Sequence, residues 1–203
     1  MIAILTADII ESKGLHSSKW MPALKRCLKQ WGDTPLTWEI YRGDEIQLRL
    51  APVKALMAAI QIKAAIRSIK GLDIRISIGV GTETYVGSGV SESNGTAYQR
   101  SGRTLEELKK NKVNLMLSTP DEAYNEKLNL MLRLASDFMD NWSTVSAEII
   151  SLSLVHPTIS QKSLADQLSI KQSAVSQRLK RARWQLTQEL LEYYANTIEK
   201  VKE

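Results

Sequence analysis

Segments typical of β-strands occur only in the first 120 residues of the chain. The first of them, Ile2 to Ala7, is almost entirely apolar, which predicts a strand buried on both faces in the middle of a sheet. The other strand-like segments are 36–41, 46–50, 74–78 and 113–117. Between 143 and 203 only helical spacing is found. This change predicts an α+β domain over 1–119, a connector helix within 120–142 and an all-α domain over 143–203.

Helix-like segments separate the predicted strands. Residues 19–30 and 53–69 carry apolar side chains at helical spacing, and a third helix is predicted over 96–110. The order is therefore β-α-β-β-α-β, followed by a further helix and strand. Two helices on one face of a mainly antiparallel sheet would give the ferredoxin-like arrangement. On the second helix we expect three cations to be solvated, namely Lys63, Arg67 and Lys70.

Acidic residues lie at the ends of two predicted strands. Gly43 permits a tight turn, which predicts a β-hairpin with Asp44 and Glu45 at its tip. Asp8 follows the first apolar segment, where we expect it to end a central strand. Carboxylate oxygens are the ligands that hard divalent cations prefer, so the three acids are candidate metal ligands. The alternative is that Asp44 and Glu45 only form a turn, because acidic residues favour turns through local hydrogen bonds.

The composition excludes several classes of protein. Cys27 is the single cysteine, so neither a disulfide framework nor a cysteine-based metal site can be built. The N-terminal apolar segment has no basic residue before it, unlike a signal peptide, and it is far shorter than the roughly 20 residues of a membrane span. We therefore expect a cytoplasmic protein with no membrane partner. The net charge of +5 permits nucleic-acid binding without arguing for it.

Three short helical segments begin the predicted all-α domain, over 145–155, 160–168 and 172–183. Their apolar spacing is that of a helix-turn-helix: Ala165, Leu168 and Ile170 are followed by Val175 and Leu179, four residues apart. The third helix would expose Gln172, Ser173, Ser176, Gln177, Lys180 and Arg181. Amide and hydroxyl groups can read base edges, and Lys and Arg can bind phosphates, so we expect this helix to contact double-stranded DNA. The alternative is a basic, solvated helix without a nucleic-acid partner.

A last helix is predicted over 184–201. Its apolar face could cover the helix-turn-helix or pair with the same helix of a second copy, and the sequence does not decide between them.

Four segments of the first domain occur in an order that is informative when they are taken together. They are Thr6-Ala7-Asp8-Ile9, Arg42-Gly43-Asp44-Glu45, Arg75-Ile76-Ser77-Ile78-Gly79-Val80 and Gly95-Thr96-Ala97-Tyr98-Gln99-Arg100-Ser101-Gly102-Arg103. Over residues 1–118 they resemble the class III nucleotidyl cyclase and GGDEF (diguanylate cyclase) superfamily, which implies a palm-like domain. With the C-terminal helix-turn-helix pattern included, the whole chain resembles the SatD family, a bacterial group.

The cyclase resemblance implies roles for individual residues. Asp8 and Asp44 would hold two divalent ions, Mg²⁺ or Mn²⁺, with the Ile9 carbonyl assisting and Glu45 as a further candidate ligand. Arg103 would stabilise the charge of a phosphoryl-transfer transition state. In cyclases the two groups face each other across a dimer, so Asp8 and Asp44 would lie opposite Arg103 of a partner chain.

The groups that recognise the nucleotide depart from the cyclase pattern. Gln99 replaces the Asn that orients the ribose, and Glu92 stands where a base-reading Asp is common. Ile40 stands in place of a base-reading Lys, and Arg42 replaces the first Gly of the GGDEF signature. A purine nucleotide is the ligand that the resemblance implies, with an incomplete set of base contacts.

These observations predict a homodimeric DNA-binding regulator whose first domain binds a nucleotide with Mg²⁺ or descends from one that did. The first alternative is an enzyme, a nucleotidyl cyclase or a related nucleotidyl transferase acting on ATP or GTP. The second is a scaffold that uses both domains for protein contacts.

Overall fold

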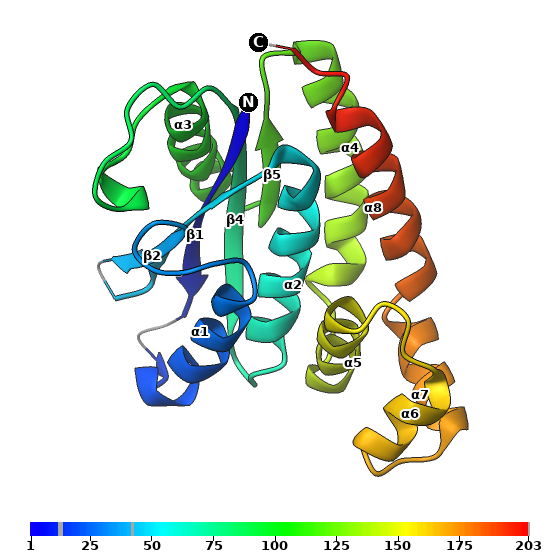
Figure 1. Ribbon diagram of the computed structural model, residues 1–203. Helices are drawn as coiled ribbons and strands as arrows, with labels where there is room; N and C mark the ends of the chain where they lie inside the picture. Colours follow the sequence, from blue (N-terminus) through cyan, green and yellow to red (C-terminus); the bar gives the residue numbers. More distant parts are fainter. Residues whose placement is uncertain (12–13, 42, 203) are drawn as a thin grey trace.

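The computed structural model describes residues 1–11, 14–41 and 43–202. Its strands form one five-stranded sheet in the order β2-β3-β1-β4-β5 (Figure 1). The strands are β1 (Ile2–Ile10), β2 (Trp38–Tyr41), β3 (Glu45–Leu50), β4 (Asp73–Gly81) and β5 (Leu115–Ser118). β1 lies between β3 and β4 and is antiparallel to both, whereas β5 is parallel to β4. The nearly all-apolar first segment is therefore the central strand, as predicted.

Helices cover both faces of the sheet (Figure 1). The helices that follow the strands are α1 (Met21–Lys29), α2 (Ala55–Arg67), α3 (Thr96–Asn111) and α4 (Glu122–Met139), and the short 3-10 helices are η2 (Ser17–Lys19), η3 (Pro52–Lys54) and η4 (Val90–Glu92). One face of β1, represented by Leu5, packs in the main core with Leu24 of α1 and Ile60 of α2. Ile4, on the other face, packs against Ala97 of α3. The α+β class predicted from the sequence is confirmed.

The structure corrects the boundaries of the first two predicted strands. β1 continues through Asp8 to Ile10, so Asp8 lies inside the strand and does not end it. Leu36 lies in a turn before β2 and is 63% exposed. The strand predicted over 36–41 from alternating apolar residues is therefore too long, because β2 begins at Trp38. Gly43 has a φ of 88° in the β2–β3 turn, which confirms the tight hairpin.

Lys63 was expected to be solvated, and this prediction is wrong. Its side chain is fully buried on α2, where Nζ lies 2.8 Å from Asp73 Oδ1 and 2.6 Å from Asp140 Oδ1. Two carboxylates compensate for the desolvation of the ammonium group, which would otherwise be prohibitive. Arg67 is also half-buried and donates to the Trp142 carbonyl oxygen at 2.6 Å. These cations therefore join α2 to β4 and to the end of α4.

Two asparagines on α4 protect the outer edge of β5. Asn129 accepts from the Leu117 N–H and donates to the Leu117 carbonyl oxygen, both at 2.8 Å. Asn125 makes the same pair of bonds with Thr119, at 2.8 and 3.0 Å. Side-chain amides thus take the place of a neighbouring strand, which removes a free edge that could pair with another chain.

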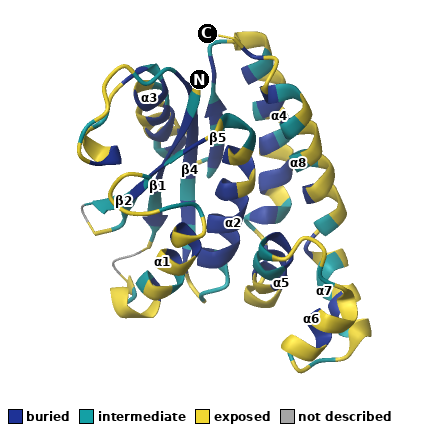
Figure 2. Ribbon diagram, in the orientation of Figure 1, coloured by how far each residue is buried: buried dark blue, intermediate teal, exposed yellow. Residues whose placement is uncertain are grey.

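The C-terminal helices are α5 (Thr144–Val155), α6 (Gln161–Gln167), α7 (Gln172–Arg181) and α8 (Trp184–Ile198). α5 and α8 contribute Ile150 and Ile198 to the same core as the sheet, and the Tyr194 hydroxyl donates to the Pro52 carbonyl oxygen at 2.6 Å. α6 and α7 instead form a small separate cluster with α5, and their surfaces are mostly exposed (Figure 2). The division of the chain at 119 and 142 stays a prediction, and the main core extends across both positions.

Candidate functional site

Two regions of the structure contain the candidate site residues, and the first is the sheet face beneath α3. Asp8 of β1 is the register partner of Glu45 on β3 and of Arg75 on β4. The Ile9 N–H donates to the Asp44 carbonyl oxygen at 3.3 Å, so the hairpin turn lies directly beside β1. The pairing of the central strand with the hairpin thus brings together four of the predicted site residues, Asp8, Ile9, Asp44 and Glu45, although they are far apart in the sequence.

Cations within the chain pair with two of these acids, Asp8 and Glu45. Arg75 Nη1 lies 3.3 Å from Asp8 Oδ2, and Lys109 Nζ, at the end of α3, lies 3.9 Å from Glu45 Oε1. A hydrogen bond with Glu106 raises the pKa of Lys109, and the charges of Glu106, Asp8 and Glu45 raise it further. Neither of these cationic partners was expected from the sequence. The available signal was Arg75, which alternates with isoleucines on a strand predicted to neighbour the acids.

The residues present do not fit a two-ion site well. Within residues 1–11, 14–41 and 43–202, no group of three or more His, Cys, Asp or Glu side chains could hold a metal ion. A cation would also have to compete with Arg75 for Asp8, whose Oδ1 is buried without a hydrogen bond, as is Gln47 Oε1 on β3. The face is therefore polar and incompletely satisfied, and Asp8 and Glu45 already have cations of the same chain beside them.

The predicted nucleotide contacts lie elsewhere in the same chain. Glu92 is in η4, where Ser88 donates to its carboxylate from the backbone and the hydroxyl, and these hydrogen bonds lower its pKa. Gln99 is exposed in the first turn of α3, and the start of this helix is bonded to the end of β4 through Thr82 and Thr96. β4 pairs there with Ile2, at the opposite end of β1 from Asp8.

Arg103 is exposed halfway along α3 and lines a cavity of about 480 Å³ with Ser118 and Asn129. Arg103, Gln99 and Glu92 are thus not gathered around Asp8 within one chain. Arg42 lies outside the described residues.

Nearby, a partly buried triad that was not expected from the sequence joins three segments. Arg49 of β3 donates to Glu83 at 2.8 Å from Nε and 2.6 Å from Nη2, and the Tyr98 hydroxyl of α3 donates to the same carboxylate at 2.7 Å. Burial alone would raise the pKa of Glu83, but the hydrogen bonds from Arg49 and Tyr98 lower it below its ordinary value. Burial and the bond to Glu83 raise the pKa of Tyr98 to about 12. The triad fixes the loop after β4 against the sheet.

The second region is the α6–α7 pair. Leu164 and Ala165 of α6 and Val175 of α7 are buried against Ile149 of α5. The intervening turn is closed by the Ile170 N–H, which donates to the Ala165 carbonyl oxygen at 3.0 Å. Ser169 has a φ of 51°, a left-handed conformation in which Gly is commoner. The apolar spacing found in the sequence therefore corresponds to two short helices packed across a tight turn.

The outer face of α7 has the composition predicted for it. All six candidate DNA-binding residues are exposed, namely Gln172, Ser173, Ser176, Gln177, Lys180 and Arg181. Arg181 Nη2 lies 3.4 Å from Gln177 Oε1, and among the described residues neither Lys180 nor Arg181 has a carboxylate partner. The cationic side chains of this face are therefore available to a ligand.

Positive charge is concentrated around this pair of helices. The chain has 27 Lys and Arg against 22 Asp and Glu. Residues 160–183 contain six of these cations and one of the acids, so the other 179 residues carry 21 of each. The net charge of +5 thus arises in one short segment, which is a stronger signal for a polyanionic partner than the total charge.

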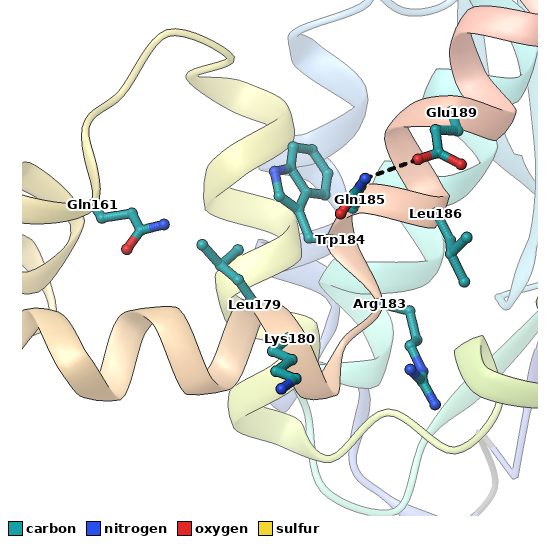
Figure 3. Close-up of a pocket in the computed structure, with 8 residues that line it drawn as sticks. All are labelled: Gln161, Leu179, Lys180, Arg183, Trp184, Gln185, Leu186 and Glu189. Carbon is teal, nitrogen blue, oxygen red and sulfur yellow. Dashed lines mark hydrogen bonds between the residues drawn. The ribbon is translucent and has the colours of Figure 1, made fainter.

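A cavity of about 570 Å³ lies between this segment and α8 (Figure 3). Leu179 of α7 and Trp184 of α8 line it, and Gln161 of α6 lies across from them. On α8, Gln185 Nε2 donates to Glu189 Oε1 at 3.1 Å. The Trp142 indole donates to the Ala182 carbonyl oxygen at 2.9 Å, which fixes the α7–α8 junction to the main core.

The whole chain was also compared with known proteins. Residues 1–188 match the SatD family, so the chain belongs to this family, as the sequence indicated. A comparison with curated proteins gave no match. None of the helices in the described part of the chain is long and apolar enough to cross a membrane.

Proposed function

We propose that this protein is a homodimeric DNA-binding regulator and that α6 and α7 form a helix-turn-helix. The observation that carries the proposal is the outer face of α7, where amide and hydroxyl side chains share one exposed surface with Lys180 and Arg181, which have no carboxylate partner among the described residues. In a helix-turn-helix, the second helix enters the major groove, where such side chains contact bases and phosphates. A dimer would present two α7 helices to a repeated half-site.

Binding to duplex DNA tests this proposal. We expect the full chain to bind a mixture of random-sequence duplexes at low salt in a mobility-shift assay. The double variant Lys180→Ala/Arg181→Ala should bind at least about tenfold more weakly, because it loses two phosphate contacts. Lys25→Ala/Arg26→Ala is the matched control, since it removes an adjacent Lys-Arg pair that is exposed on α1. Absence of DNA binding by the wild-type protein at low salt would refute the proposal.

We further propose that the sheet domain is a palm-like, ferredoxin-like domain related to nucleotidyl cyclases. The β-α-β-β-α-β order and the strand order β2-β3-β1-β4 support this, together with the position of Asp8 beside the Asp44-Glu45 hairpin. The internal pairing of Asp8 with Arg75 favours a domain that descends from a nucleotide-binding one over an active two-metal enzyme. A purine nucleotide and Mg²⁺ or Mn²⁺ stay predictions from the resemblance.

The enzymatic alternative has a direct test. The protein is incubated with ATP or GTP and Mg²⁺ or Mn²⁺, and the nucleotides are separated by chromatography. We expect no cyclic or transferred product. A product that disappears in Asp44→Ala but persists in Asp33→Ala, which removes an exposed acid elsewhere, would establish the enzyme instead.

A further inference from the structure

The outward face of α4 carries two exposed leucines. Leu130 is 51% exposed and Leu134 is 67% exposed, although the same helix buries Leu128 and Leu132 completely in the main core. Because successive residues of an α-helix are rotated by about 100°, Leu130 and Leu134 lie on the side opposite to the buried leucines. Their exposure is therefore a property of the helix surface and does not result from an imperfectly packed core.

α8 extends this apolar surface. It runs beside α4 in the opposite direction (Figure 1), and the Tyr124 and Thr197 hydroxyls lie 3.1 Å apart between the two helices. Leu186 and Tyr193 of α8 are 49% and 38% exposed. They are seven residues apart, and Thr197 lies four residues after Tyr193 on the same side of α8, so Tyr193 lies on the flank that contacts α4. Leu186 lies further along the same side, where it also lines the cavity between α7 and α8. We call Leu130, Leu134, Leu186 and Tyr193 the α4/α8 patch.

Exposed charges flank the patch on α4, namely Glu122, Glu126, Lys127, Arg133 and Asp137. Among them, Glu126 and Arg133 are a pair of opposite sign that is centred on Leu130. Glu126 and Arg133 are both exposed and are seven residues apart, which places them on one flank of the helix on either side of Leu130. In the part of the chain that the structure describes, neither has an ion-pair partner. An apolar centre with a charged rim is the usual composition of a protein–protein interface.

We propose that the α4/α8 patch joins two copies of this chain, with the two α4 helices antiparallel about a twofold axis beside Leu130. Glu126 and Arg133 each lie about 3.5 residues, or roughly 5 Å, from this axis along the helix. Glu126 then lies level with Arg133 of the second copy, and Arg133 with its Glu126, while Leu130 packs against Leu130. The arrangement gives two equivalent ion pairs across an apolar seam, as a self-complementary interface requires.

This inference rests on the dimer in the proposed function and assigns its surface. The arrangement of charges favours a second copy as the partner. Glu126 and Arg133 lie on the same flank of α4, so each can pair with the opposite residue of an identical helix. An unrelated partner would require no such symmetry of Glu126 and Arg133 about Leu130.

Charge reversal tests the arrangement. Sedimentation velocity or light scattering with size exclusion would measure the mass of the full chain over a range of concentrations, and we expect a dimer. Glu126→Arg and Arg133→Glu should each weaken self-association by at least about tenfold, because each places like charges opposite one another twice. An equimolar mixture of the two variants should dimerise again, since one copy then carries only cations and the other only anions at these positions.

The apolar seam has its own control. Leu134→Asp should also yield monomers, whereas Leu36→Asp, which changes an equally exposed leucine before β2, should leave the dimer intact. A wild-type monomer at about 100 µM, a concentration at which a specific interface of standard size is occupied, would overturn the inference. Dimers that persist in both charge variants would also overturn it.

DNA binding by the same proteins separates this inference from the proposed function. If the charge-reversal variants are monomers that still bind DNA weakly through a single α7, both the DNA-binding function and the α4/α8 dimer interface are supported. A wild-type protein that dimerises through α4 but binds no DNA would support the surface and refute the DNA-binding function. A third outcome is a protein that binds DNA as a dimer and whose dimerisation is unaffected by Glu126→Arg, Arg133→Glu and Leu134→Asp. It would support the DNA-binding function and refute the α4/α8 patch as the dimer interface.

Discussion

The sheet face beneath α3 and the outer face of α7 are both rich in polar side chains, but they differ in how their charges are compensated. Beneath α3, Arg75 is paired with Asp8 and Arg49 with Glu83. On α7, Lys180 and Arg181 point to solvent and have no carboxylate partner among the residues that the structure describes. Charges that are paired within the chain thus stabilise the fold, whereas Lys180 and Arg181 are available to an external polyanion.

Removal of a buried cation should have the largest effect on stability. Lys63→Ala leaves Asp73 and Asp140 without their shared ammonium group, so we expect the free energy of unfolding to fall by about 3–5 kcal/mol. Urea denaturation followed by circular dichroism measures this change. Lys70→Ala, at an exposed position after α2, should change the free energy of unfolding by less than about 0.5 kcal/mol. Equal effects would show that Lys63 is not compensated as the structure indicates.

A core truncation in the α6–α7 cluster should have a smaller and more local effect. Leu164→Ala removes a buried side chain from this cluster and should destabilise it by about 2–5 kcal/mol. Because the cluster is separate from the main core, we expect faster hydrogen exchange in α6 and α7 with unchanged exchange in β1 and α2. Leu36→Ala, at an exposed position, is the control. Uniformly faster exchange across the sheet would contradict the separation of the two clusters.

The Arg49–Glu83–Tyr98 triad predicts a pH dependence of stability. Folding lowers the pKa of Glu83 from its ordinary value of 4.5, so the carboxylate contributes stability above pH 4.5 and loses it as the pH falls through the lower folded value. We expect the wild-type free energy of unfolding to fall more steeply below pH 4.5 than that of Glu83→Gln. Denaturation at a series of pH values measures both slopes. Identical slopes for the two proteins would show that the Glu83 carboxylate does not contribute to stability.

Removal of the α7 cations should leave stability almost unchanged. Lys180→Ala/Arg181→Ala eliminates no carboxylate contact within the described residues, so we expect a change in the free energy of unfolding of at most about 0.5 kcal/mol. Thermal denaturation checks this. A larger loss would mean that Lys180 and Arg181 stabilise the fold, and it would contradict their availability to an external ligand.

The sequence was most informative where local pattern and tertiary packing agree. The apolar segment from Ile2, the hairpin at Gly43 and the spacing of Val175 and Leu179 all correspond to observed elements, because period and turn chemistry act locally. The sequence was misleading for Lys63, whose partners come from β4 and the end of α4. Helical spacing cannot reveal a cation that is buried by distant carboxylates.

The candidate site was predictable only in part, for the same reason. The proximity of Asp8 to the Asp44-Glu45 hairpin was expected from the strand pattern and from the resemblance to cyclases. The pairing of Asp8 with Arg75 and of Glu45 with Lys109 depends on the register of β4 and on the position of the last turn of α3. These are long-range features that a local pattern does not contain.

The salt dependence of DNA binding tests the central claim most directly. Fluorescence anisotropy with a labelled random-sequence duplex gives the slope of the logarithm of affinity against the logarithm of salt concentration. We expect the affinity of the wild-type protein to fall as the salt concentration rises. The slope should be shallower by about 1 to 2 in Lys180→Ala/Arg181→Ala, because this variant loses two phosphate contacts. In Lys25→Ala/Arg26→Ala the slope should equal that of the wild type. No binding at low salt, or the same slope in all three proteins, would contradict the assignment of α7 as the DNA-contacting helix.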